Sequence, residues 1–349
     1  MSIQNSYMYI ADLDTAIEHS IGIEKLKNRT VLITGATGTI GSFVADTLFR
    51  YNQISNAQIK VCVVGRHPEK LKCRFENWND SNLIALPYDI QSNITFDRQV
   101  DYIIHAAGNA HPAAFNEDPV GTIIGNINGT YGLLKYGLAH DCTRLLYVSS
   151  GEVYGQGELS LNDFSEDYAG YVDGFSPRSC YPQSKRAAEN LCFSFTCQYG
   201  METVIARPCH TYGPEITPSD NRASVQFIKN ALNREDIVMK SAGSQLRSYN
   251  YVADCTSGLL TILINGKSGE AYNVANPAVR ITIAQLAEII AKSAGKKVVY
   301  ANPTDIDIAN RSPIAKQVLS SKKLENLGWR GAFSAEVGIR HTIDILQGK

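Results

Sequence analysis

The sequence has little of what marks a membrane-spanning, secreted or nucleic-acid-binding protein. It contains no apolar stretch of about 18 residues or more, and it does not begin with a charged segment followed by an apolar one. We therefore predict neither a membrane span nor a signal peptide, and expect a cytoplasmic protein. The formal net charge is only −1, which argues against a nucleic-acid or anionic-membrane partner.

Disulfide and metal-ligand spacings are also missing. The eight cysteines are scattered without a CxxC pair, and the seven histidines show no HExxH spacing. Several cysteines lie inside apolar runs such as "VCVV". Buried, reduced thiols are therefore favoured over disulfides or zinc ligands, and we predict no structural metal.

What the sequence does have is a regular alternation of short apolar runs and longer helical patterns. Strands are predicted at 29–34, 59–64, 82–86, 101–107, 144–150 and 201–208, and helices at 38–52, 121–140 and 181–200. Continuous apolar strands between helices are typical of a parallel sheet covered on both faces. The predicted fold class is α/β, a doubly wound parallel sheet of the Rossmann type with a smaller C-terminal substrate-binding lobe.

The pattern changes beyond about residue 210, where loops lengthen and strands shorten. We predict a dinucleotide-binding domain over 29–210, with 246–275 returning to it. Residues 211–245 and 276–349 form the predicted lobe, which faces the carboxyl ends of the strands. Residues 1–28 are expected to be an ordered extension without an assigned role.

A glycine-rich loop joins the first predicted strand to the first predicted helix. In "ITGATGTIGS", Gly35, Gly38 and Gly41 allow a tight turn and a close approach to a pyrophosphate, which the helix N-terminus then binds. Its position between strand and helix favours dinucleotide binding over a plain glycine turn. The predicted cofactor contacts here and after later strands are Gly35, Gly38, Thr39, Ile40, Gly41, Ala106, Ala107 and Pro208.

The end of the second predicted strand bears on which cofactor binds. An NAD enzyme often has an acid there, whereas "VVGRHPEK" has Gly65 and Arg66. An arginine at this place can accommodate a 2′-phosphate, but it can equally be an exposed side chain beside NAD. We expect NAD and leave NADP open. Asp89 and Ile90, in "PYDI", are predicted contacts for the adenine.

"SCYPQSKRA" places Tyr181 four residues before Lys185, on one face of a helix. Two ordinary surface residues would give the same spacing. A phenol is a poor base at neutral pH, and a nearby ammonium favours its phenolate. The pair is therefore either a general base with a tuning cation or a solvated helix start.

The glycine loop, "HAAGNAHP", "YVSSGEVYG" and "YPQSK", taken in order, resemble the extended short-chain dehydrogenase/reductases that act on nucleotide sugars. The likeness runs from about residue 29 to "LGW" at 327–329. Within that group, "SPRSCYPQSKRAAE" and "QLRSYNYVAD" most resemble UDP-glucuronate decarboxylases. The resemblance implies that Tyr181 is the catalytic base, that Lys185 holds the nicotinamide ribose, and that Ser150 orients the substrate hydroxyl.

The segment "SSGEVYG" separates the reactions open to such a site. A 4-keto sugar can lose CO2, eliminate water or take hydride back from the other face. Gly151 stands where 4,6-dehydratases have the aspartate that protonates the leaving hydroxyl, whereas Glu152 is retained as in the decarboxylases. We favour decarboxylation, with 4-epimerisation or dehydration as alternatives. A non-catalytic dinucleotide-binding regulatory protein is the alternative from another class.

Cations and polar groups are needed to bind a nucleotide sugar. Arginine suits a diphosphate, and Arg247 matches the family arginine with that role. The resemblance further implies that Asn126 supports the active site, although helix capping would explain it too, and that the helices at 121–140 and 181–200 form a homodimer. The predicted substrate contacts are His111, Glu152, His210, Arg222, Arg247 and Arg311.

Overall fold

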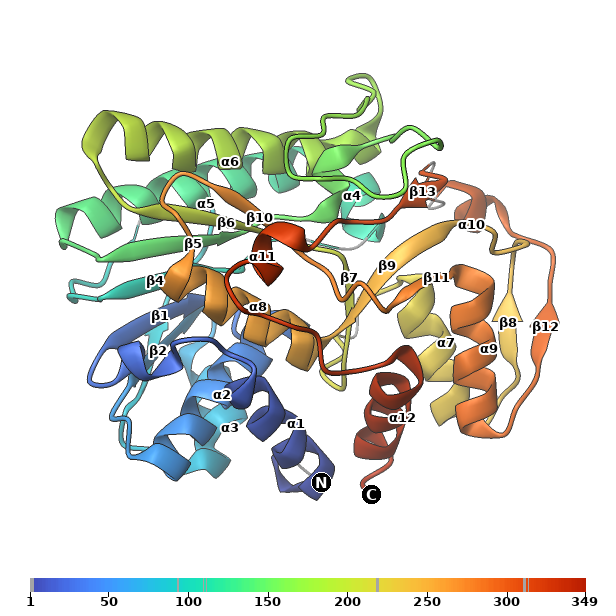
Figure 1. Ribbon diagram of the computed structural model, residues 1–349, viewed down its shortest axis with the longest axis horizontal. Helices are drawn as coiled ribbons and strands as arrows, with labels where there is room; N and C mark the ends of the chain where they lie inside the picture. The colour runs from blue at the N-terminus through green and yellow to red at the C-terminus, as the bar shows by residue number, and fades with distance from the viewer. Residues whose placement is uncertain are drawn as a thin grey trace.

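The structure of the protein is a computed structural model that describes residues 3–92, 94–108, 110, 112–217, 220–309, 312 and 314–349. A central sheet of seven parallel strands has the order β10-β6-β5-β4-β1-β2-β3 (Figure 1). The strands are β1 (Thr30–Thr34), β2 (Lys60–Gly65), β3 (Leu83–Pro87), β4 (Tyr102–His105), β5 (Arg144–Val148), β6 (Thr203–Pro208) and β10 (Ala271–Val274). This sheet confirms the predicted doubly wound fold.

Helices cover both faces of the sheet. One face carries α5 (Pro119–Ala139) and α6 (Cys180–Tyr199), and the other carries α2 (Thr39–Ser55) and α8 (Val252–Asn265) (Figure 1). Strand β1 is apolar between its two terminal threonines because both of its faces are buried. Val31 and Ile33 pack in the core on the α2 and α8 side, whereas Leu32 packs in the core on the α5 and α6 side.

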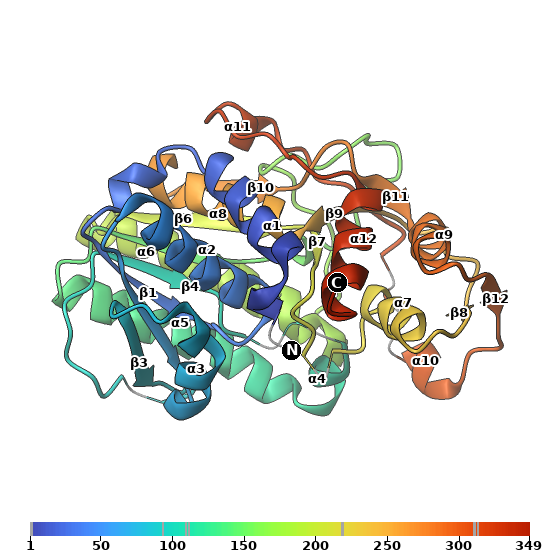
Figure 2. The same cartoon turned by 90° about the horizontal axis from the view of Figure 1, so that it is seen from below.

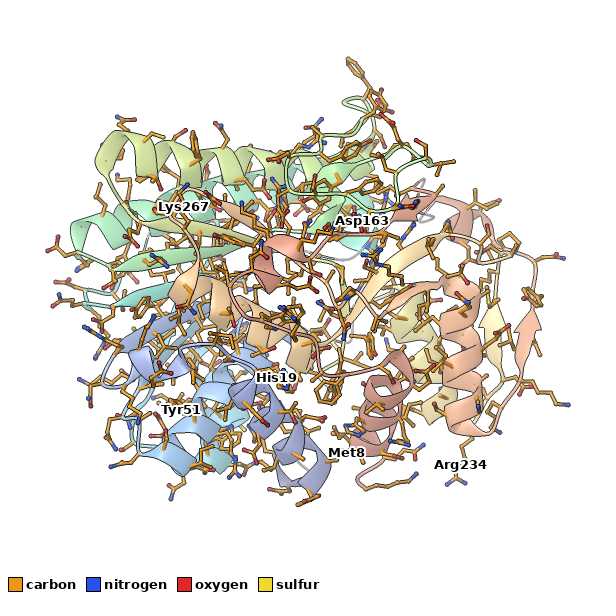
Figure 3. All side chains as sticks on the ribbon, viewed as in Figure 1. Met8, His19, Tyr51, Asp163, Arg234 and Lys267 are labelled. Atoms are coloured by element: carbon orange, nitrogen blue, oxygen red, sulfur yellow. The ribbon has the colours of Figure 1, made fainter. Side chains whose placement is uncertain are left out.

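The N-terminal extension is folded against the body of the protein. Helix α1 (Tyr7–Glu18), whose two ends are marked by Met8 and His19 in Figure 3, packs on α2 and α8. Asp12 accepts hydrogen bonds from the Tyr251 hydroxyl at 2.6 Å and from the His341 ring at 2.8 Å. The extension therefore contacts both the sheet domain and the C-terminal end of the chain, which lies beside the N-terminus in Figure 1.

Asp46, in the middle of α2, is a second point of attachment for the extension. Its fully buried carboxylate accepts hydrogen bonds from Gln4, Tyr9, Trp78 and Arg74, at distances between 2.5 and 2.9 Å. Arg74, from α3 (Pro68–Phe75), also pairs with Glu215 at 2.9 Å. One buried charge thus joins the extension, α2 and α3.

A smaller lobe lies at the carboxyl ends of the strands, to the right in Figure 1 and in the view from below in Figure 2. In it β9 (Leu246–Tyr251) pairs with β7 (His210–Tyr212), β11 (Arg280–Thr282) and β13 (Lys316–Gln317), and β8 (Ile237–Met239) pairs with β12 (Val298–Tyr300). Its helices are α7 (Ala223–Leu232), α9 (Ile283–Ala294), α10 (Asp305–Ala309) and α12 (Ala335–Leu346). The division into domains stays a prediction, although β10 does join the central sheet after β9 has formed part of the lobe.

The connection between β5 and α6 also lies at the carboxyl ends of the strands. It contains the short helices η4 (Gly151–Tyr154) and η5 (Pro177–Ser179). Arg280 of β11 donates to Asp163 of this connection at 2.9 Å, which ties it to the lobe (Figure 3). None of the helices in the described ranges is long and apolar enough to cross a membrane.

Candidate active site

A large cavity of about 1180 Å³ lies between the central sheet and the smaller lobe. Its walls are formed by the loops after β1, β2, β3, β4, β5 and β6, together with residues of α5, α7, β7 and β9. Because parallel strands present their carboxyl ends at one edge, the sheet brings these loops together there. The volume exceeds that of a typical pocket for one small ligand, so the cavity has room for a dinucleotide and a second molecule.

The glycine loop after β1 has the geometry that a phosphate cradle requires. Gly35 has φ +71°, and a Cβ atom there would lie 2.7 Å from the carbonyl carbon of Ala106. A Cβ atom on Gly41 would lie 2.3 Å from the Gly35 oxygen. Helix α2 begins at Thr39 without a side-chain cap, so its N-terminal amides are left for an anion. The loop therefore fits a pyrophosphate.

Lys185 on α6 and Asn126 on α5 are two buried polar residues close to the cavity. Lys185 Nζ donates to the Val148 oxygen at 2.9 Å and lies 4.7 Å from the centre of the Tyr147 ring. Burial lowers the pKa of Lys185 to about 8, although Glu189 raises it. Asn126 is in the interior of α5 rather than at its cap, and its Nδ2 donates to Ser184 at 2.9 Å. Its buried Oδ1 has no partner within the described residues, which leaves an acceptor for a ligand.

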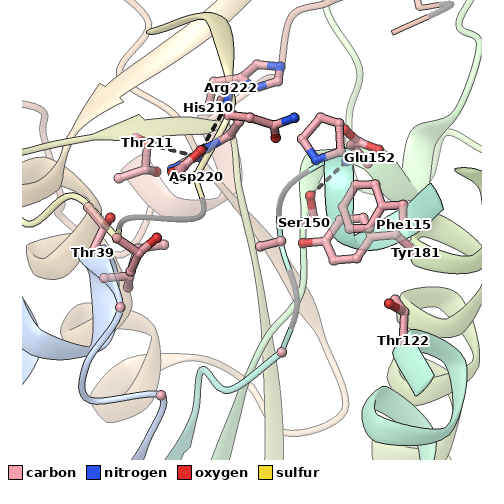
Figure 4. Close-up of a pocket in the computed structure, with 18 of the residues that line it drawn as sticks. Thr39, Phe115, Thr122, Ser150, Glu152, Tyr181, His210, Thr211, Asp220 and Arg222 are labelled. Atoms are coloured by element: carbon pink, nitrogen blue, oxygen red, sulfur yellow. Dashed lines mark hydrogen bonds and ion pairs between the residues drawn. The ribbon is translucent and has the colours of Figure 1, made fainter. Parts of the chain in front are cut away.

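Tyr181 lies on the first turn of α6 and faces Ser150, at the end of β5 (Figure 4). Burial raises the pKa of Tyr181 to about 12, and the nearby Glu152 carboxylate adds to the increase. A hydrogen bond with Ser150 and the charge of Arg222 act in the opposite direction. Lys185 Nζ lies 5.8 Å from the centre of the Tyr181 ring. The geometry therefore brings the half-buried Ser150 and the buried Tyr181 and Lys185 into one group.

Phe115 packs flat against Tyr181, as Figure 4 shows. The two ring centres are 4.5 Å apart with an interplanar angle of 17°. Phe115 is fully buried, and it comes from α4 (Pro112–Glu117), far from Tyr181 in the sequence. Stacking of this kind fixes the orientation of the Tyr181 ring and excludes water from one of its faces.

Glu152 is held by an arginine that the sequence analysis did not identify. Arg178, in η5, donates from Nη2 to Glu152 Oε1 at 3.1 Å, and both side chains are largely buried. The guanidinium also lies 5.6 Å from the centre of the Phe115 ring. The arginine therefore links Glu152 to the aromatic pair beside the reacting hydroxyl.

A group of cationic and neutral side chains lines the opposite wall. Arg247 is buried and donates to the Leu246 and Ile314 carbonyl oxygens, and it has no carboxylate partner within the described ranges. Burial lowers its pKa. His210 faces it from β7, and burial together with the charges of three arginines lowers the pKa of His210 to about 3. His210 is therefore a neutral hydrogen-bonding group at pH 7 rather than a spare cation.

Arg222 is less available to a substrate. Its guanidinium donates to both carboxylate oxygens of Asp220, at distances between 2.6 and 3.0 Å, and to the Thr211 carbonyl oxygen at 3.2 Å (Figure 4). Asp220 lies only two residues earlier, so this pair neutralises Arg222 locally. Of the two predicted substrate-binding arginines that the structure describes, Arg247 is therefore the one whose charge no nearby carboxylate neutralises.

The cavity gathers nearly all of the residues predicted from the sequence. Lys185 is the exception among the described ones, because it lies beneath Tyr181 rather than in the wall. His111 and Arg311 lie outside the described residues. The predicted residues in the wall are Gly35, Gly38, Thr39, Ile40, Gly41, Arg66, Asp89, Ile90, Ala106, Ala107, Asn126, Ser150, Glu152, Tyr181, Pro208, His210, Arg222 and Arg247.

The fold is a doubly wound α/β fold whose glycine loop and Ser150, Tyr181 and Lys185 lie at the same end of the central sheet. Residues 31–275 match the NAD dependent epimerase/dehydratase family, and the chain belongs to that family. It is 32% identical over 324 residues to UDP-glucuronic acid decarboxylase 1 of Xenopus tropicalis, covering 92% of this chain and 72% of the relative. UDP-glucuronic acid decarboxylase 6 of Arabidopsis thaliana is 32% identical over 318 residues, with 89% and 87% covered.

Solved structures share the fold at lower identity. The dTDP-glucose 4,6-dehydratase of Streptomyces venezuelae, with NAD bound, superposes with a TM-score of 0.77 at 22% identity, over 91% of this chain and 97% of the other. The UDP-glucuronic acid 4-epimerase of Bacillus cereus, in complex with UDP-glucuronic acid and NAD, gives 0.75 at 21% identity, over 91% and 99%. At these identities the likeness concerns the fold alone.

Proposed function

We propose that the protein is a nucleotide-sugar decarboxylase that acts on UDP-glucuronate or a related nucleotide-linked uronate through a 4-keto sugar. The observation that carries this proposal is the placement of Glu152, paired with Arg178, beside Tyr181 and Ser150. The curated relatives at 32% identity, which carry the name UDP-glucuronic acid decarboxylase, support the same reaction.

The cavity fits a nicotinamide dinucleotide, as the glycine cradle and the unpartnered Asn126 oxygen indicate. Gly35, Gly38, Thr39 and Gly41 would hold its pyrophosphate, and Lys185 and Asn126 would hold the ribose near Tyr181. When bound, it would supply the hydride acceptor for the oxidation of the sugar and the hydride donor for the return.

Tyr181 then acts as the general base at the sugar C4 hydroxyl. Its phenolate oxygen takes the hydroxyl proton, while Ser150 donates a hydrogen bond to the same sugar oxygen and orients it. Because burial raises the Tyr181 pKa to about 12, the phenolate needs positive charge nearby, and Lys185 is the cation on its own helix. Phe115 keeps the ring at the correct angle for this transfer.

The 4-keto sugar next loses CO2 from C5. The C5–C6 bond breaks, its electron pair passes to the C4 oxygen as an enolate, and a proton then adds to C5. In this proposal Glu152 orients the water that delivers this proton, and its hydrogen bond from Arg178 supports that role. Return of the hydride to C4, with the proton from Tyr181, gives a UDP-pentose.

Two neighbouring reactions use the same first step and differ afterwards. Dehydration needs an acid at the position of Gly151, which carries no side chain, and a Cβ atom there would lie 3.0 Å from Leu319 Cδ1. Epimerisation needs the hydride to return to the other face of the ketone. The product therefore decides among the three reactions.

The test is incubation of the purified protein with UDP-glucuronate without added cofactor, followed by mass and NMR analysis of the product. Loss of CO2 supports the proposal, whereas an unchanged mass with inverted C4 identifies an epimerase. The Tyr181→Phe variant should be at least about 100-fold slower. Tyr171→Phe, which changes an exposed side chain, is the matched control. A regulatory protein that only binds the dinucleotide would give no product in any of the three forms.

We also propose a homodimer formed through α5 and α6, in the cytoplasm. Apolar side chains on these helices are exposed, including Ile124 and Tyr131 of α5 and Phe193 and Tyr199 of α6. All eight cysteines are unpaired, which agrees with a reducing compartment. Sedimentation velocity of the protein and of Tyr131→Glu tests the dimer. The variant should shift to monomer, and an unchanged sedimentation coefficient contradicts this interface.

A further inference from the structure

We infer that the cavity discriminates in favour of the 2′-phosphorylated dinucleotide, NADP, with Arg66 as the principal phosphate contact. The inference deepens the proposed function, because it names the cofactor of the same site. It concerns the adenosine end of the cavity, which lies away from the Tyr181 group.

The first support is the register of the sheet. Thr34 at the end of β1 pairs with Val64 near the end of β2, so the glycine loop and the end of β2 begin side by side. In folds of this type the adenosine ribose lies at this junction, with the pyrophosphate on the loop. The residues that follow Val64 are therefore the ones that approach the 2′ position.

The second support is the chemistry of those residues. Gly65 has no side chain where NAD-binding proteins place the acid that holds both ribose hydroxyls. A Cβ atom on Gly65 would lie 3.3 Å from Leu71 Cδ1, so a larger side chain would have to displace Leu71. The position thus lacks the carboxylate that would repel a phosphate.

The third support is the set of cations in the wall. Arg66, His67 and Lys70 all line the cavity here, and all are exposed. Within the part of the chain that the structure describes, Arg66 and Lys70 make no side-chain hydrogen bond or ion pair. A planar guanidinium with free donors suits a phosphate monoester, and a lysine adds a point charge.

Two acids lie near these cations, and neither neutralises Arg66. Glu69 pairs with His67 at 3.5 Å and remains largely exposed. Asp89, after β3, accepts the backbone N–H of Gln91 at 3.0 Å. Among the described residues, Arg66 therefore has no acidic partner, and its guanidinium donors are available to a ligand phosphate.

The experiment is isothermal titration calorimetry of the full-length protein with NADP, NAD, 2′,5′-ADP and 3′,5′-ADP, after bound nucleotide has been released and identified by mass. We expect NADP to bind at least about tenfold more tightly than NAD, and 2′,5′-ADP more tightly than its 3′ isomer. Arg66→Gln should weaken NADP roughly tenfold or more and change NAD by less than about threefold. Lys72→Gln removes an exposed charge of α3 outside the cavity wall and should change neither.

Three results would overturn the inference. NAD could bind as tightly as NADP, or be the nucleotide that the protein carries when purified. Arg66→Gln could weaken both dinucleotides equally, which would make Arg66 a general contact. If neither dinucleotide binds, the proposed function fails together with this inference, whereas tight binding of NAD alone overturns only the inference.

Discussion

The pair formed by Arg178 and Glu152 gives the sharpest prediction about the site. Nη2 of Arg178 lies 3.1 Å from Glu152 Oε1, and the two side chains are only 13% and 15% exposed. Removal of one partner from a buried ion pair costs about 3–5 kcal/mol, because the other charge stays buried without compensation. Since the cavity admits some water, we expect a smaller loss than that range, about 2–3 kcal/mol, in the free energy of unfolding for Arg178→Gln.

A double-mutant cycle separates this pairing from the other contacts of Arg178. Arg178→Gln, Glu152→Gln and the double variant are compared by urea unfolding and, with a turned-over substrate, by kcat/KM. The double variant should be little worse than the poorer single variant, which corresponds to a coupling energy of about 1.5 kcal/mol or more. The unfolding measurement needs no substrate, so it remains informative whatever the reaction proves to be.

Arg144→Gln serves as the control for the cycle. Arg144 pairs with Glu202 at the start of β5, at the edge of the sheet away from the cavity. Combined with Glu152→Gln it should be additive within about 0.5 kcal/mol. The same additivity for the Arg178 and Glu152 variants would refute the reasoning, because it would show that the two charges do not depend on each other.

Three further predictions concern Gly35 in the glycine loop, Lys185 near Tyr181, and Asp46, which holds the N-terminal extension. Gly35→Ala should lower the free energy of unfolding by about 1–3 kcal/mol and abolish dinucleotide binding in calorimetry, because Gly35 has a φ of +71° and its Cβ would meet the Ala106 backbone. Gly132→Ala is the control, since the space around its Cβ is open, and it should have neither effect. The kcat/KM of the protein should fall as the pH rises through about 8, since the lowered pKa of Lys185 removes its positive charge there, and a flat profile between about pH 7 and pH 10 would contradict this. Asp46→Ala should cost about 3–5 kcal/mol in urea unfolding because four donors lose their acceptor, and a loss below about 1 kcal/mol would show that the extension is held mainly by apolar packing.

The sheet and the cofactor loop were predictable because both depend on local sequence patterns. Apolar runs of strand length and glycines at fixed spacing between a strand and a helix determine the local backbone, and the parallel sheet then brings the strand ends together. The spacing of Tyr181 and Lys185 was visible in the sequence, but their predicted roles and that of Ser150 came from the resemblance to the extended short-chain dehydrogenase/reductases.

The contacts that hold those residues were not predictable from one sequence. Arg178 lies in the same quoted stretch as Tyr181, but its partner Glu152 is 26 positions earlier, and no spacing rule connects them. Phe115 belongs to none of the motifs read from the sequence, and its stacking on Tyr181 depends on how α4 packs. Asp46 resembles an ordinary helix carboxylate until the extension supplies its partners. Such pairings arise from tertiary packing, which periodicity does not encode.

We propose that the Tyr181 site oxidises C4 of a nucleotide-linked uronate and releases CO2 before it reduces the same carbon. The most direct measurement is the mass and NMR spectrum of the product formed from UDP-glucuronate that carries deuterium at C4, in ordinary water. We expect a UDP-pentose that has lost CO2, keeps deuterium at C4 and carries a solvent hydrogen at C5. A product that retains the carboxylate, or that loses the C4 deuterium to water, would contradict it.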